Sequence, residues 1–158
     1  MSESSVTYLG AVTELLATIQ KEEKESIEKA AGVLAKALSE DRLIHVIGPG
    51  GHSNMAVEET FWRSGGLAAI NAILDPGTNL IHGAGRSMTI ERTPGYAKSV
   101  LNAYGVESGD PLLIVNAYGI NSMTIDCALE CKERGVTSIA ITSTSFADRV
   151  PAGAPARH

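Results

Sequence analysis

Apolar residues recur at three- and four-residue intervals along the first forty residues. The recurring positions are Val6, Leu9, Val12, Leu16, Ile19, Ile27, Ala31, Leu34 and Leu38. This spacing places them on one face of an α-helix, so residues 4–38 are predicted to form one long helix or two helices joined near residues 20–25. We expect the stripe to be covered, either by the chain's own domain or by a second subunit.

Beyond residue 40 the pattern changes to short apolar runs separated by helical segments. Four runs predict buried strands, at residues 43–47, 67–74, 112–115 and 136–142. Helical patterns follow near residues 54, 94 and 123, whereas residues 78–93 predict a connection with at most a short helix. The residues from 146 onward have no period and predict an irregular end. Strands that alternate with helices indicate an α/β fold with a parallel sheet and helices on both faces.

A glycine-rich turn follows the first predicted strand. The sequence Gly48-Pro49-Gly50-Gly51 lets the backbone approach a ligand closely, because glycine has no side chain. Residues 52–54 then begin a helix, where unpaired N–H groups favour an anion. The pattern predicts an anion or sugar pocket at residues 48–54; the alternative is a tight turn without a ligand. Neither the Walker lysine loop nor the full dinucleotide-binding spacing is present.

Three predicted strands end in polar segments, at residues 48–54, 116–122 and 142–145. Ligands of parallel sheets bind outside the carboxyl ends of the strands, so these segments are expected to meet in one pocket. The candidate binding residues are Gly50, Gly51, Ser53, Asn116, Gly119, Asn121, Ser122 and Ser143.

Composition narrows the choice of partners. The chain has 158 residues, of which 44% are hydrophobic, enough for one domain with a substantial core. Its net charge of −5 argues against nucleic acid or an anionic membrane as a partner, because phosphate surfaces require clustered Lys and Arg. A small anionic ligand remains compatible with local N–H donors. No membrane span or signal peptide is predicted, which favours a cytoplasmic protein.

The only cysteines are Cys127 and Cys131, four residues apart in a predicted helix. Two buried thiols in a reducing compartment fit this spacing better than a disulfide framework. No metal site and no cofactor are predicted.

The order of the motifs resembles the SIS (sugar isomerase) domain family. The segments GPGGHS, VEETFWRSGGL, ER-x-x-GYA, GD-x-LLIV, ALECKERG and IAITS occur in that order, and the resemblance spans residues 24–158. It is greatest to a largely uncharacterised branch described as phosphoheptose-isomerase-like or phosphosugar-binding. The resemblance implies a three-layer α/β/α sandwich with a parallel, flavodoxin-like sheet. Residues 1–40 would be an N-terminal helical extension, and residues 41–158 an SIS-type domain that lacks its last strand and helix.

The resemblance also implies a function and an assembly. The implied ligand is a sugar phosphate or a related small anionic sugar, and the implied assembly is a homodimer or a higher homo-oligomer. Aldose–ketose isomerisation through an enediolate needs a base and a proton donor. Glu59 resembles the position of a catalytic glutamate in phosphoheptose isomerases, Glu91 is the second acidic candidate, and His52 is the candidate donor. Those enzymes have a metal-linked histidine where this chain has Met55, so no metal site is implied.

Other interpretations remain open for the same residues. Glu59 could instead lie on a solvated helix face or pair with Arg63, and His52 could cap a helix. The family's turn is rich in serine and threonine, whereas this chain has Asn116, Tyr118 and Asn121 there. One alternative is therefore a non-catalytic phosphosugar sensor. Another is an etherase-like lyase that acts on an amino-sugar phosphate with a pair of glutamates.

Overall fold

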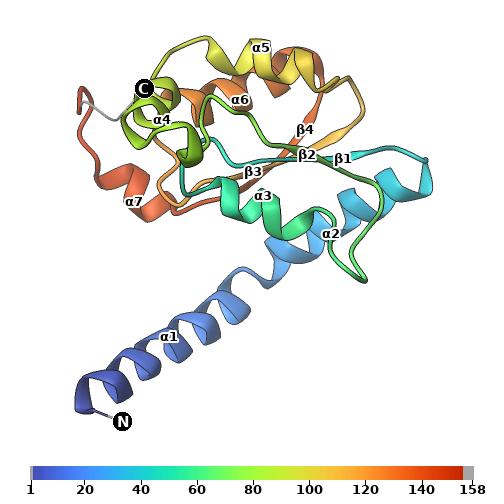
Figure 1. Ribbon diagram of the computed structural model, residues 1–158. Helices are drawn as coiled ribbons and strands as arrows, with labels where there is room; N and C mark the ends of the chain where they lie inside the picture. The colour runs from blue at the N-terminus through green and yellow to red at the C-terminus, as the bar shows by residue number, and fades with distance from the viewer. Residues whose placement is uncertain (1, 155–158) are drawn as a thin grey trace. The chain divides into compact units, whose positions relative to one another are not determined.

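The structure is a computed structural model that describes residues 2–154 (Figure 1). It divides into two compact units, Met1–Lys36 and Ala37–His158. The helices are α1 Glu3–Glu22, α2 Lys24–Ser39, α3 Asn54–Thr60, α4 Ala84–Glu91, α5 Tyr96–Ala103, α6 Ser122–Arg134 and α7 Thr144–Arg149, with a 3-10 turn η1 at Leu80–His82. The strands are β1 Ile44–Ile47, β2 Ile70–Ile73, β3 Pro111–Val115 and β4 Thr137–Ile141.

The first unit is helical. Ser2 caps α1 by accepting a hydrogen bond from the Ser5 backbone N–H, and the break between α1 and α2 falls at Glu23. The predicted joint near residues 20–25 is therefore confirmed. All side chains of α1 are exposed, including those of its apolar stripe: Leu9 is 49% exposed and Leu16 is 61% exposed.

The four predicted strands form one parallel sheet with the order β2-β1-β3-β4. Val46 is opposite Ala72 of β2 on one side and Leu113 of β3 on the other, and Leu113 is opposite Ile139 of β4. This order is the flavodoxin-like one, which confirms the predicted fold class. All four carboxyl ends consequently lie at the same edge of the sheet.

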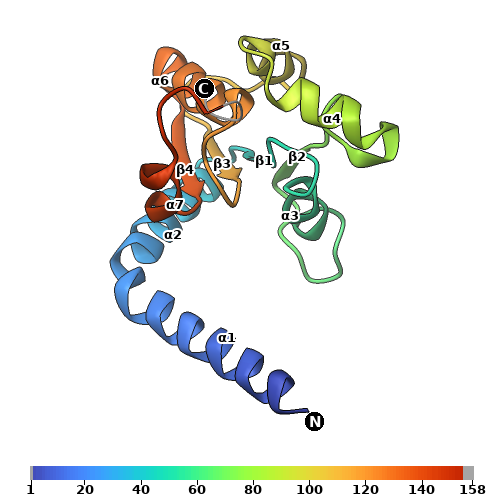
Figure 2. The same cartoon turned by 90° about the vertical axis from the view of Figure 1, so that its left-hand side faces the viewer.

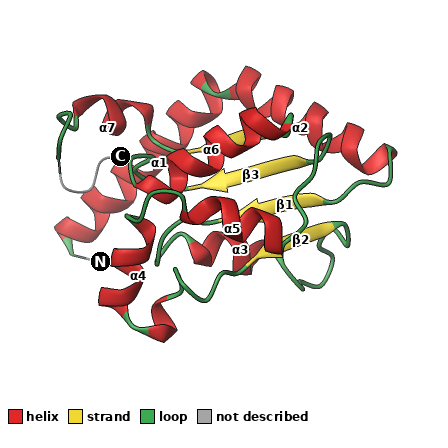
Figure 3. Ribbon diagram, turned by 90° about the horizontal axis from the view of Figure 1, so that it is seen from above, coloured by secondary structure: helices red, strands yellow, loops and turns green. Residues whose placement is uncertain are grey.

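Helices cover both faces of the sheet, as expected for parallel strands. Figures 2 and 3 show α5 and α6 along one face, and Figure 2 shows α3 on the other. The main core lies under α5 and α6 and is formed by Ile47, Ile73, Ala97, Val100, Leu101, Val106, Leu112, Ile114, Met123, Cys127, Cys131 and Val136. Both cysteines are buried free thiols, and burial raises the pKa of Cys131 to about 11, so the thiol stays protonated.

Two segments are more regular than the sequence predicts. Residues 78–93 contain both the η1 turn and the eight-residue helix α4, where at most a short helix is expected. The segment expected to be irregular from residue 146 begins inside α7, because the Ser143 hydroxyl accepts a hydrogen bond from the Phe146 N–H and caps a helix. The chain end at residues 155–158 lies outside the described residues, so the expectation of a missing strand and helix stays a prediction.

A partly buried polar network around the buried His45 fixes the opposite, amino-terminal edge of the sheet. The Asn71 amide donates to His45 Nδ1 at 2.9 Å and to the Tyr104 carbonyl oxygen at 2.9 Å. His45 Nε2 therefore carries the proton and donates to the Asp110 carboxylate at 3.2 Å. Burial alone would raise the pKa of Asp110, but hydrogen bonds from His45, Arg42 and the Glu107 N–H outweigh it, so the pKa is below its ordinary 3.8.

We predict that Asp110→Asn lowers the free energy of unfolding by about 1–3 kcal/mol at pH 7, because the charge of a partly buried, hydrogen-bonded carboxylate is lost. The Asp110 pKa is lower in the folded chain, so its ionisation stabilises the fold fully above pH 3.8 and progressively less as the pH falls through the folded pKa. Urea unfolding of both proteins between pH 3 and 7 tests this. An equal difference in stability at every pH would contradict it.

Candidate functional site

The turn after β1 is held by two asparagine side chains from the turn after β3. The Pro49 carbonyl oxygen accepts hydrogen bonds from Asn116 Nδ2 at 3.0 Å and from Asn121 Nδ2 at 2.8 Å. Asn116 Nδ2 also donates to Ser53 Oγ at 3.2 Å. The two turns are therefore joined above the carboxyl edge of the sheet, where the sequence predicts a ligand site.

The same asparagines shape the second turn. Asn116 Oδ1 accepts from the backbone N–H groups of Tyr118 and Gly119, at 3.1 and 2.8 Å. Asn121 caps α6, because its Oδ1 accepts from the Thr124 N–H at 2.8 Å. Gly119 has a φ of 64°, which favours glycine. The side-chain oxygen and nitrogen of both asparagines are thus hydrogen-bonded to other groups of the protein.

Glu91, the last residue of α4, places its carboxylate beside the glycine turn. The Gly51 backbone N–H donates a hydrogen bond to it. Gly50 has a φ of 149°, and a Cβ atom there would lie 2.6 Å from Glu91 Oε2 and 3.5 Å from the Asn116 and Asn121 amide nitrogens. The missing side chain of Gly50 therefore leaves space in which a carboxylate and two amides converge.

Burial raises the pKa of Glu91 above its ordinary 4.5, although the nearby Arg92, the Gly51 N–H and His52 oppose the shift. A carboxylate with a raised pKa is a stronger base than an ordinary glutamate. Perturbed carboxylates of this kind cluster at functional sites.

The connection before α4 is fixed by buried polar groups. The Asp75 carboxylate accepts from the Thr78 N–H at 3.0 Å and from the Tyr96 hydroxyl at 3.1 Å. Ser87, in the middle of α4, donates its hydroxyl to the Thr78 carbonyl at 2.6 Å, and Asn54 donates to the Gly50 carbonyl at 3.0 Å. Asn54 also donates to Thr78 Oγ1 at 3.4 Å, so Thr78 links α4 to the helix that follows the glycine turn.

A hollow of about 550 Å³ adjoins the turn. It lies at the carboxyl ends of β3 and β4 beside the start of α3. Its lining residues are His52, Ser53, Met55, Ala56, Val115, Ala117, Ile141, Thr142 and Ser143.

A family model described as SIS domain matches residues 7–143. The chain belongs to the SIS domain family. Its fold is similar to a phosphoheptose isomerase from Francisella tularensis, with a TM-score of 0.70, 19% identity and coverage of 92% of this chain and 77% of that one. It is also similar to a phosphoheptose isomerase from Neisseria gonorrhoeae, with a TM-score of 0.68, 19% identity and coverage of 94% and 80%.

Two relatives of this SIS domain are UPF0309 proteins. One, from Caldanaerobacter subterraneus, is 36% identical over 140 residues, which cover 88% of this chain and 56% of the relative. Another, from Brucella ovis, is 35% identical over 153 residues, which cover 97% of this chain and 63% of the relative. The chain thus spans 56% and 63% of the lengths of these relatives.

The SIS domain brings most of the predicted site residues to one edge. Gly50, Gly51, Ser53, Asn116, Gly119, Asn121 and Glu91 lie around the two turns just described. Ser122 is adjacent and donates its hydroxyl to the Arg92 carbonyl, whereas Ser143 caps α7. His52 is exposed and lines the hollow.

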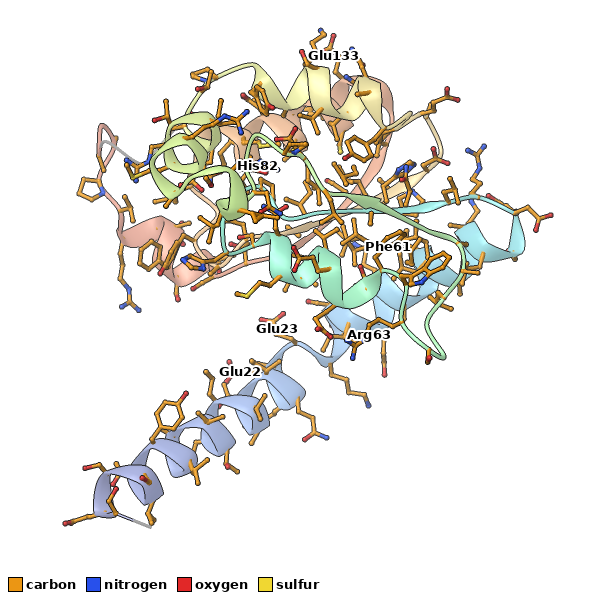
Figure 4. The ribbon with its side chains drawn as sticks, in the orientation of Figure 1. Glu22, Glu23, Phe61, Arg63, His82 and Glu133 are labelled. Atoms are coloured by element: carbon orange, nitrogen blue, oxygen red, sulfur yellow. The ribbon has the colours of Figure 1, made fainter. Side chains whose placement is uncertain are left out.

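Glu59 lies apart from these residues. Its carboxylate is 3.5 Å from the Arg63 guanidinium, and the two side chains are 70% and 60% exposed. This is the solvated ion pair that the sequence left open as the alternative for Glu59. Figure 4 shows Arg63 beyond the end of α3.

Sequence reasoning missed the buried groups that position Glu91. Asp75, Thr78 and Ser87 occupy a segment without a clear period, and its links to other elements, from Asp75 to Tyr96 and from Thr78 to Asn54, join residues that are distant in the sequence. The Asp75-Pro76-Gly77 turn was the only available signal. Among residues 2–154 no three histidine, cysteine, aspartate or glutamate side chains group as a possible metal site. Within the same residues, every helix is too short or too polar to span a lipid bilayer.

We predict that Gly50→Ala lowers the free energy of unfolding by about 1–3 kcal/mol, because the new methyl group meets Glu91 and the backbone is held at a positive φ. Gly85→Ala is the matched control: Gly85 lies in α4, and its added methyl group would meet no atom within 4 Å. The control should be neutral or slightly stabilising. Equal melting temperatures for the two variants would contradict the tight fit at Gly50.

Proposed function

We propose that this SIS domain catalyses aldose–ketose isomerisation of a sugar phosphate. The observation that carries the proposal is the placement of Glu91 beside the glycine turn and the β3–α6 turn, at the carboxyl edge of the sheet. The family and the fold shared with phosphoheptose isomerases support it. The reaction needs no cofactor, because it moves protons within one molecule.

Glu91 is the proposed base. Its carboxylate removes the proton from the carbon next to the substrate carbonyl, and His52 gives a proton to the carbonyl oxygen, which forms an enediol. Glu91 then returns its proton to the former carbonyl carbon while the neighbouring hydroxyl gives its proton back to His52, so substrate and product have the same atoms and both residues are regenerated. The raised Glu91 pKa brings the base closer to the optimum for proton transfer near neutral pH.

Substrate binding is proposed at the groups that remain available around the two turns. Ser53 Oγ already accepts from Asn116, so toward a ligand it acts as a donor. The N-terminus of α6, which begins at Ser122, favours a phosphate through its N–H groups and dipole. The backbone at Gly50, Gly51 and Gly119 is proposed to contact the ligand. Asn116 and Asn121 hold the two turns together, and Ser143 borders the hollow.

The second candidate function is a non-catalytic phosphosugar sensor. The engagement of the Asn116 and Asn121 amides by the Pro49 carbonyl favours it, because these groups bind the protein instead of a ligand. The lyase alternative requires two glutamates, and Glu59 is paired with Arg63 on an exposed helix face. It therefore ranks below the other two.

We predict that Glu91→Gln reduces solvent-deuterium exchange at C1 or C2 of a sugar phosphate by about 10²- to 10⁴-fold, because an amide cannot accept the proton. Glu59→Gln is the matched control, since it makes the same change at an exposed ion pair. It should retain activity within about twofold. NMR of candidate sugar phosphates in D₂O measures both variants.

If Glu59→Gln lost most of the deuterium exchange and Glu91→Gln lost little, the base would be Glu59 and not Glu91. Saturable thermal stabilisation by sugar phosphates without any exchange in the unmodified protein would instead support the sensor.

We also propose that the chain is a cytoplasmic homodimer or higher homo-oligomer that associates through α1. The α1 side chains are exposed, and Leu9, Val12, Leu16 and Ile19 follow one another at three- and four-residue spacing. Such a stripe packs well against an identical helix. Residues 1–40 would then serve assembly, and residues 41–158 would carry the site.

We predict that Leu9→Glu combined with Leu16→Glu weakens self-association at least about a hundredfold, because two apolar contacts are replaced by charges. The control is Ala11→Glu combined with Thr18→Glu, which adds the same charge at the same spacing on another face of α1. Light scattering after size exclusion measures the mass of each. A control that dissociates as fully as the stripe variant would contradict this interface.

A further inference from the structure

The start of α6 is bonded to both of the segments that meet at the Glu91 carboxylate. In the glycine turn, the Pro49 carbonyl oxygen accepts from Asn121 Nδ2 at 2.8 Å. At the end of α4, the carbonyl oxygen of Arg92, the residue after Glu91, accepts from the Ser122 hydroxyl at 3.1 Å. Two consecutive residues of α6 therefore connect the glycine turn with the end of α4.

A second hydrogen bond from α6 holds the same end of α4. The Gly95 backbone N–H donates to the Asp126 carboxylate at 2.6 Å, a short, charge-assisted hydrogen bond. Asp126 lies four residues after Ser122, so the two side chains share one face of α6. The turn at residues 92–95, which joins α4 to α5, is thus held at both of its ends by that face.

The Ser122 hydroxyl is fully used by this contact. The Ser122 side chain is buried, and its hydroxyl donates to the Arg92 carbonyl oxygen. A serine hydroxyl has one hydrogen, so this bond leaves it no hydrogen to donate to a phosphate. The backbone N–H groups at the start of α6 are separate donors, and the phosphate site proposed there depends on them.

We propose that Ser122 and Asp126 are positioning residues for Glu91 and that the Ser122 hydroxyl does not bind the substrate. The proposal rests on the proposed function, in which Glu91 is the base, and adds what holds that base in place. Glu91 is the last residue of α4, and the bonded turn begins at the next residue, so a displacement of the turn displaces the carboxylate. A misplacement of about 1 Å can cost roughly 100-fold in rate.

The kinetics of deuterium exchange separate a positioning role from a binding role. The probes are ribulose 5-phosphate, fructose 6-phosphate and sedoheptulose 7-phosphate in D₂O, and the one that exchanges fastest with the unmodified protein is used for every variant. Ser122→Ala should lower kcat by about 10- to 100-fold and leave KM within about twofold, because the base moves while the backbone N–H groups remain. Ser99→Ala, which makes the same change at an exposed position of α5, is the matched control and should leave both constants unchanged.

Asp126 allows a conservative variant. Asp126→Asn keeps a side-chain oxygen that accepts from the Gly95 N–H, so it should retain kcat within about threefold. Asp126→Ala has no acceptor for that N–H and should lower kcat without raising KM, as Ser122→Ala does. Equal losses in Asp126→Asn and Asp126→Ala would contradict a role through the Gly95 bond.

The pKa of Glu91 gives a readout that does not require turnover. Burial is the largest cause of its raised value, whereas Arg92, the Gly51 N–H and His52 oppose it. If the turn is released, water reaches the carboxylate, so the pKa should fall toward its ordinary 4.5 in Ser122→Ala and stay raised in the control. Titration of the carboxyl ¹³C resonance, assigned by its absence in Glu91→Gln, measures this.

The outcomes separate this inference from the proposed function. A higher KM in Ser122→Ala with an unchanged kcat would show that the hydroxyl binds the substrate, which overturns the inference and leaves the proposed function standing. A Ser122→Ala protein with the kcat and the Glu91 pKa of the unmodified protein would also overturn the inference. If the unmodified protein exchanges no deuterium with any probe, the proposed function is wrong, and the Glu91 pKa in Ser122→Ala then decides whether Ser122 positions the carboxylate.

Discussion

The candidate site depends on one backbone carbonyl. Pro49 follows a buried strand, and its carbonyl oxygen accepts two side-chain amides, from Asn116 and Asn121. A carbonyl oxygen has two lone pairs, so the pair of bonds satisfies it fully in a buried setting. Because both donors belong to the turn after β3, these bonds hold the turns of two neighbouring strands together.

This arrangement explains why some polar residues hold the two turns together while others remain available to a ligand. Asparagine can accept at one end and donate at the other, so Asn116 shapes its own turn while it holds the neighbouring one. A serine or threonine at that position could not do both over the same distance. The missing side chain of Gly50 then leaves the Glu91 carboxylate next to the same two amides.

The sequence predicts the regular elements well because their signal is local. Continuous apolar runs predict buried strands, and apolar stripes with a period of 3.6 residues predict amphipathic helices. These two patterns depend only on which face of an element is buried, and they located β1 to β4, α5 and α6 correctly. The convergence of the polar turns followed from parallel topology. The partners of individual side chains could not be predicted, since Glu91 lies beside the glycine turn that follows β1, and Asp75 accepts from Tyr96 at the start of α5. Glu59 and Glu91 are both candidates in the sequence, and the structure distinguishes them, because Glu59 pairs with the exposed Arg63 whereas Glu91 lies beside the glycine turn.

The two sides of the site are built differently, and this difference bears on what each can do. The β1–β3 side is rigid, because hydrogen bonds from buried amides fix both turns. The β4 side is open: most of the β4 side chains are exposed, and Ile141 lines the apolar hollow. Proton transfer requires reacting groups held within a fraction of an ångström, which only the rigid side offers.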